Sequence, residues 1–141
     1  MQASNPDYRA VIERGFVAAP FIRDIGITLK ECGPGWIEAQ LILGERHLQQ
    51  IGFPHGGLIA TLADHCAGGA AVTLCPPGRF ALTLEFKTNF LKAARASRLT
   101  CRADVLKHGR SFSVVEACVF ADEATPVLLA KTTATLAIMD S

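Results

Sequence analysis

The feature that most constrains the fold is a strongly apolar stretch in the middle of the chain, LIATLADHCAGGAAVTL at positions 58–74. Its length suits a helix better than a strand, and its apolar residues fall on every side of that helix. A helix that is apolar all round must be buried. The rest of the chain must therefore wrap around this segment, and Gly68 and Gly69 would let neighbouring backbone come close.

Most of the remaining chain alternates apolar and polar residues with the period of a β-strand. Two strands are expected before the helix, at 25–31 and 36–43, and a short amphipathic helix is expected at 6–17. Four strands are expected after it, at 81–90, 99–105, 112–120 and 127–138, with turns at 107–110 and 122–126. In the strand at 81–90 the apolar residues alternate with polar ones, and they are Leu82, Leu84, Phe86 and Phe90.

This order of elements predicts an α+β fold in which an antiparallel sheet of about six strands wraps round one long central helix. That arrangement is the outline of a hotdog fold. A length of 141 residues fits a single domain, 1–141, and an apolar fraction of 50% is enough to build a core.

Charge and cysteine usage exclude several classes of protein. The chain has 14 Lys and Arg against 13 Asp and Glu, scattered along its length, so neither nucleic acid nor a membrane is expected as a partner. No apolar run reaches the ~18 residues of a membrane span, and the N-terminus does not read as a secretory signal. Five cysteines without a CxxC pair predict reduced thiols in a cytoplasmic protein, with no metal and no cofactor.

Two features of the segment 49–64 point to chemistry. Gly56 and Gly57 open the helix, where backbone N–H groups lack partners and the helix dipole is positive. Without a Cβ at Gly57, a substrate carbonyl can approach its N–H as in an oxyanion hole, although two glycines can also simply permit a tight turn. Asp64 is the only carboxylate of the helix, and it is either a base or nucleophile or the partner of a structural ion pair.

The spacing of these residues predicts an assembly. Gly57 and Asp64 lie two turns apart on one helix face, which separates them by about 10 Å along the axis. The aspartate side chain is too short to reach a carbonyl bound at Gly57 of its own helix. If both act on one carbonyl they come from two chains, as in a homodimer whose central helices lie antiparallel and whose active sites are shared. Gly56 and His55 are candidate substrate contacts, and His55 could equally hold the loop.

The run HLQQIGFPHGGLIATLAD at 47–64 resembles the signature of hotdog-fold acyl-CoA thioesterases of the phenylacetate-pathway (PaaI) type. The family pattern matches at His47, Gln49, Gly52, the His-Gly-Gly at 55–57 and Asp64. The strand LTLEFKTNFLKAA at 82–94 also looks like its counterpart in that family.

The resemblance implies an enzyme that hydrolyses an acyl-CoA or aryl-acyl-CoA thioester to the free acid and CoA. Asp64 would be the catalytic base or nucleophile, and the Gly57 N–H of the partner subunit would polarise the thioester carbonyl. Gln49, where the family often has Asn, would orient the water or the carbonyl, and Thr83 would help to hold the water. Of the other histidines near these residues, His65 is interpreted as structural and His47 as a loop residue.

Several alternatives stay open at this stage. The same fold could serve a non-catalytic acyl-CoA binding or sensing protein, or an enoyl-thioester hydratase. Aryl-acetyl, benzoyl and medium-chain acyl groups all fit, and the assembly is either a dimer or a dimer of dimers. The phosphates of CoA require basic groups near the mouth of the site. The candidates are Lys87, Lys92, Arg95, Arg98 and Arg110.

Overall fold

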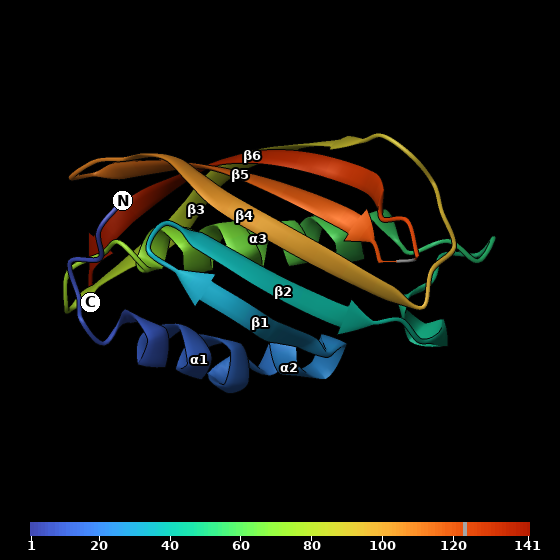
Figure 1. Cartoon of the computed structure of the whole chain (residues 1–141), viewed down its shortest axis with the longest axis horizontal. Coiled ribbons are helices and arrows are strands. Elements are labelled where there is room, and N and C mark those ends of the chain that lie inside the picture. The colour runs from blue at the N-terminus through green and yellow to red at the C-terminus, as the bar shows by residue number, and fades with distance from the viewer. Residues whose placement is uncertain (123) are drawn as a thin grey trace.

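The computed structural model describes residues 1–122 and 124–141, so position 123 of the turn predicted at 122–126 lies outside the described residues. One antiparallel sheet has the strand order β1-β2-β4-β5-β6-β3 (Figure 1). This confirms the predicted six-stranded sheet. The strands are β1 (Ile27–Gly33), β2 (Trp36–Ile42), β3 (Arg79–Phe90), β4 (Arg98–His108), β5 (Phe112–Ala121) and β6 (Val127–Asp140).

The central helix α3 (Gly56–Val72) lies against the inner face of the curved sheet and contacts all six strands (Figure 1). Leu62, Cys66 and Ala70 are fully buried between the helix and the sheet. The predicted hotdog arrangement is therefore confirmed. The helix is not covered on every side, however. Residues spaced three or four apart along one face stay partly exposed, and we call them the open stripe of α3: Gly57, Thr61, Asp64, Gly68 and Val72.

Two short helices precede the sheet. Helix α1 (Tyr8–Ala18) packs on β1 through the buried Ile12 and Phe16, close to where the sequence predicts a helix. Helix α2 (Pro20–Ile25) is not predicted from the sequence, and it ends at Gly26, whose φ of 95° is easy only for glycine. A single 3₁₀ turn, η1 (Glu45–His47), lies in the connection between β2 and α3.

Strand β3 does not keep its apolar residues on one face. In an antiparallel pair, partners point to the same face of the sheet, and Thr83 pairs with the fully buried Leu136 of β6. Thr83 therefore faces α3. Leu82 and Leu84 lie on the opposite face and are 54% and 55% exposed. A β-bulge between Thr83 and Glu85 then shifts the phase, so that Phe86 also points to the helix side.

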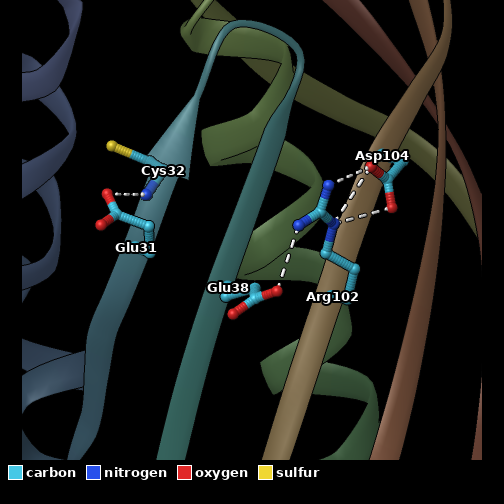
Figure 2. A network of polar contacts seen from close by, with 5 residues as sticks. All are labelled: Glu31, Cys32, Glu38, Arg102 and Asp104. Atoms are coloured by element: carbon cyan, nitrogen blue, oxygen red, sulfur yellow. Dashed lines mark hydrogen bonds and ion pairs between the residues drawn. The ribbon is translucent and has the colours of Figure 1, made fainter.

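The outer face of the sheet is polar. Arg102 of β4 donates hydrogen bonds to Glu38 of β2 at 3.1 Å and to Asp104 at 2.9 Å (Figure 2). Its guanidinium also lies 4.0 Å from the centroid of the Trp36 ring. This network covers part of the outer face with charged groups, whereas the inner face carries the core.

Candidate active site

Asp64 and Thr83 come together at the open stripe of α3. The Thr83 hydroxyl donates a hydrogen bond of 2.8 Å to the Oδ1 atom of Asp64, and both residues are half-buried. The contact depends on the phase of β3, because only a residue that faces α3 can reach the helix. The structure thus brings together two of the predicted site residues, and Oδ2 of the carboxylate is left for another partner.

The helix start differs from the expectation in one respect. His55 is the N-cap of α3, and its Nδ1 atom accepts the N–H of Gly57 at 2.9 Å. In this structure the Gly57 N–H, which the sequence predicts to bind a substrate carbonyl, is therefore occupied by the His55 ring. Of the two roles open to His55, the one observed is that of holding the first turn of the helix.

The free backbone donor at this helix end is the N–H of the preceding residue, Gly56. Within the described part of the chain, the Gly56 N–H has no hydrogen-bond partner. The absence of a side chain matters there, since a Cβ at Gly56 would lie 3.3 Å from Cζ of Phe90. The Gly56 N–H is therefore the group at this helix end that can donate a hydrogen bond to a carbonyl oxygen of a substrate.

Gln49 begins a tight loop, residues 49–54, that we call the Gln49 loop. Its side-chain Oε1 accepts the N–H of Ile51 at 2.5 Å and that of Phe53 at 3.4 Å. Because backbone N–H groups can only donate, these two contacts identify the side-chain oxygen of Gln49 as the atom that faces the loop backbone. The NH₂ group of Gln49 has no partner among residues 1–122 and 124–141, so it can donate to a carbonyl or a water.

Two cavities lie on either side of the helix start. The first, of about 410 Å³, is mostly apolar and is bounded by the Gln49 loop, by Gly56 and Ile59 of α3 and by residues 90–94. We call it the loop cavity. The second, of about 400 Å³, lies between α2, His47 and His55. Asp64 lines neither cavity, so within one chain the carboxylate is separated from the free Gly56 N–H.

Two further histidines, His47 and His65, have structural contacts. His47 is buried, with Nδ1 accepting the N–H of Gly44 at 2.9 Å and Nε2 lying 2.8 Å from the carbonyl oxygen of Ile25. His65 packs edge-on against Phe16 with ring centroids 4.5 Å apart. Desolvation lowers the pKa of His65 despite the neighbouring carboxylate, and its buried Nε2 has no hydrogen-bond partner among the described residues.

The five basic candidates for a phosphate contact differ in their surroundings. Arg98 pairs with Asp122 at 3.3 Å, and Arg95 donates to backbone carbonyls of the Gln49 loop. Lys92 is the one of the five that lines the loop cavity. Over the described residues, no cluster of three or more potential metal ligands occurs, and no helix is long and apolar enough to cross a membrane.

Comparison with known proteins is consistent with this geometry. The sequence profile of the thioesterase superfamily matches residues 51–127. Human acyl-coenzyme A thioesterase 13 is 30% identical over 116 residues, which are 80% of this chain and 81% of that protein. The 1,4-dihydroxy-2-naphthoyl-CoA hydrolase of Listeria monocytogenes is 32% identical over 92 residues, which are 65% of this chain and 75% of that protein.

A solved structure is similar over nearly the whole length. The crystal structure of a thioesterase family protein from Silicibacter pomeroyi superposes with a TM-score of 0.92 at 32% identity. The match covers 95% of this chain and 99% of that one.

Proposed function

Because the chain belongs to the thioesterase superfamily and is a thioester hydrolase, we propose that it hydrolyses an acyl-CoA or aryl-acyl-CoA thioester of the kind used by PaaI-type enzymes. The observation that carries the proposal is the half-buried Asp64 carboxylate, hydrogen-bonded by Thr83, on the helix whose N-terminus presents a free amide. A carboxylate for the attack and a donor for the carbonyl oxygen are the two groups that thioester hydrolysis requires.

In this proposal the Gly56 N–H, rather than that of Gly57, binds the thioester oxygen. The negative charge that develops there is stabilised by the N–H and by the helix dipole. Asp64 either takes a proton from the attacking water or adds to the carbonyl carbon itself. In both routes the C–S bond breaks and CoA leaves as its thiolate. In the second route the acyl group is then held on Asp64 as a mixed anhydride, which water hydrolyses to release the acid and restore the carboxylate. The Gln49 NH₂ and the Thr83 hydroxyl orient the water and the carboxylate.

The two halves of the site come from two chains. Gly56 and Asp64 are eight residues apart on one helix, about 12 Å along the axis, which is beyond the reach of an aspartate side chain. A second copy would bring its own α3 against the open stripe, antiparallel to the first. Its Asp64 would then approach the Gly56 N–H of the first chain, so each dimer would hold two shared sites.

The sheet edge supports the same dimer. Strand β3 is at the end of the sheet and is paired on one side only, whereas β1 at the other end has α1 packed against it. Leu82, Leu84, Phe86 and Phe90 of β3 are between 42% and 58% exposed. Burying the exposed part of each of these side chains in a dimer would stabilise the dimer by roughly 1 kcal/mol per side chain. Pairing β3 with β3 of a second copy would also satisfy its free backbone groups.

The first experiment measures thiol release from a panel of acyl-CoA substrates by the wild-type protein and by Asp64→Asn. We expect turnover of at least one acyl-CoA by the wild type, and a loss of at least a hundredfold in kcat in the variant without loss of the folded assembly. Full activity in Asp64→Asn would refute the assignment. Binding without thiol release would instead favour an acyl-CoA sensor, and loss of the double bond of an enoyl-CoA would favour a hydratase.

The second experiment tests the shared site by complementation. Gly56→Val blocks the amide in one chain and Asp64→Asn removes the carboxylate in the other, so each variant alone is inactive. In a randomly mixed dimer population, half of the dimers are mixed and each has one intact site, which restores about a quarter of the activity. No recovery on mixing would show that both groups act within one chain.

The odd set of five free thiols supports a cytoplasmic location.

A further inference from the structure

Arg95 lies in the connection between β3 and β4 and contacts three consecutive residues of the Gln49 loop. Its Nη2 atom donates to the carbonyl oxygen of Ile51 at 3.0 Å, and its Nη1 atom donates to that of Gly52 at 3.3 Å. The guanidinium carbon lies 4.9 Å from the centroid of the Phe53 ring. One side chain thus combines a forked hydrogen bond with a cation–π contact.

The loop is shaped to receive this side chain. Gly52 has a φ of 86°, a conformation that suits glycine, and its N–H donates to the carbonyl oxygen of Gln49 at 2.9 Å. A Cβ at Gly52 would collide with the Arg95 guanidinium. Gly52 therefore serves two needs at once, because it makes the turn and leaves room for the arginine.

The two segments that Arg95 joins are opposite walls of the loop cavity. One wall is the Gln49 loop, and the other is formed by Phe90, Leu91 and Lys92 as the chain leaves β3. Gly56, whose N–H is free, also lines this cavity. A change in the distance between the walls would move the Gln49 amide relative to that N–H.

We propose that Arg95 is a positioning residue that holds the Gln49 loop against the β3–β4 connection and so sets the place of the Gln49 amide. The inference rests on the proposed function for its effect on catalysis. It differs from the role of a phosphate ligand, which its charge alone would suggest. Both arms of its guanidinium fork already donate to carbonyl oxygens, and its flat face lies over Phe53.

The test compares Arg95→Ala and Arg95→Lys with the control Arg14→Ala, which removes the same charge from an exposed position on α1. Each protein is assayed with an acyl-CoA and with the N-acetylcysteamine thioester of the same acid, which has no nucleotide and no phosphates. Hydrogen exchange of the amides at 51–53 is measured in parallel, and thermal unfolding checks that each variant is folded.

We expect kcat to fall about tenfold with both substrates in Arg95→Ala, the change that follows from loss of one charge-assisted hydrogen bond. Amide exchange in the Gln49 loop should rise in the same variant. Arg95→Lys should recover little of the lost kcat, because an ammonium group cannot donate two parallel hydrogen bonds or stack on the Phe53 ring. Arg14→Ala should leave both measurements unchanged.

The inference is overturned if Arg95→Ala raises KM for the acyl-CoA alone and leaves loop exchange unchanged, which is the behaviour of a phosphate ligand. It is equally overturned if neither kcat nor exchange changes. If the wild type hydrolyses neither thioester, the proposed function fails, whereas the exchange comparison still decides whether Arg95 holds the loop.

Discussion

Replacing Thr83 with valine removes one hydroxyl group from the site and changes little else, because the two side chains have nearly the same shape. The hydroxyl donates a 2.8 Å hydrogen bond to the Asp64 carboxylate. A hydrogen bond to a charged group contributes about 1.5–3 kcal/mol. Both residues are half-buried, so water can replace part of the interaction, and we adopt the lower end of that range.

A loss of about 1.5 kcal/mol from the transition state corresponds to roughly a tenfold lower kcat. The free energy of unfolding should fall by no more than about 1.5 kcal/mol, since the carboxylate that loses its partner is not sealed from solvent. Thiol release at saturating acyl-CoA measures the first quantity, and urea denaturation measures the second.

Thr83→Ser is the control, since it keeps the hydroxyl and removes only a methyl group. It should retain most of the wild-type kcat. A valine variant as fast as the wild type would refute the reasoning, because the hydrogen bond would then not orient the catalytic carboxylate. An equal loss in the serine variant would also refute it, since packing of the methyl group would then be responsible.

Two further predictions concern stability. Thr73 is fully buried and accepts the Gly35 N–H at 2.8 Å, so Thr73→Val should lower the free energy of unfolding in urea by about 1–3 kcal/mol, and an unchanged value would contradict this account. The pKa of His65 is lowered by desolvation from the ordinary 6.5, so the unfolded chain binds its proton first as the pH falls. Stability should therefore decline below about pH 6.5, by at most about 1.4 kcal/mol per pH unit from this group, and His65→Leu should have a flatter profile in urea denaturation from pH 7.5 to 5.5. If the free energy of unfolding of His65→Leu fell with pH as steeply as that of the wild type, His65 would be excluded as the source of the pH dependence.

The elements with long and regular patterns were predictable. The central helix was identified from its apolar length, and its observed start at Gly56 agrees with the glycine pair of the sequence. The later strands were placed within a few residues because each alternates with a period of two. Helix α2 was missed because its six residues are too few to show a helical period.

Strand β3 was found, but its alternation did not indicate that the apolar residues divide between two faces. Leucines at 82 and 84 and phenylalanines at 86 and 90 share one face in an ideal strand, whereas the bulge divides them between two faces. The strand also lies at the edge of the sheet, so apolar residues on it need not face the core of the same chain. Neither the bulge nor the edge position has a local signature that periodicity can detect.

The site residues were predictable as a set, but their hydrogen-bond partners were not. Asp64 was singled out as the lone carboxylate of an apolar helix, and the contact with Thr83 exists. The partner of the Gly57 N–H was not foreseen, because whether His55 turns back to cap the helix depends on its side-chain rotamer. The sequence distinguished Arg95 only by its charge. Its contacts join the Gln49 loop to the β3–β4 connection, and these two segments are distant in sequence.

The uncovered edge of β3 also bears on how the protein is made. A newly folded single chain presents a long row of unpaired backbone groups flanked by leucine and phenylalanine side chains. Such a row is a template for any extended polypeptide, so a chain that does not meet another copy is prone to aggregate. Charged substitutions at Leu82 or Leu84 would therefore reveal whether the yield of folded protein in a cell is limited by assembly rather than by folding.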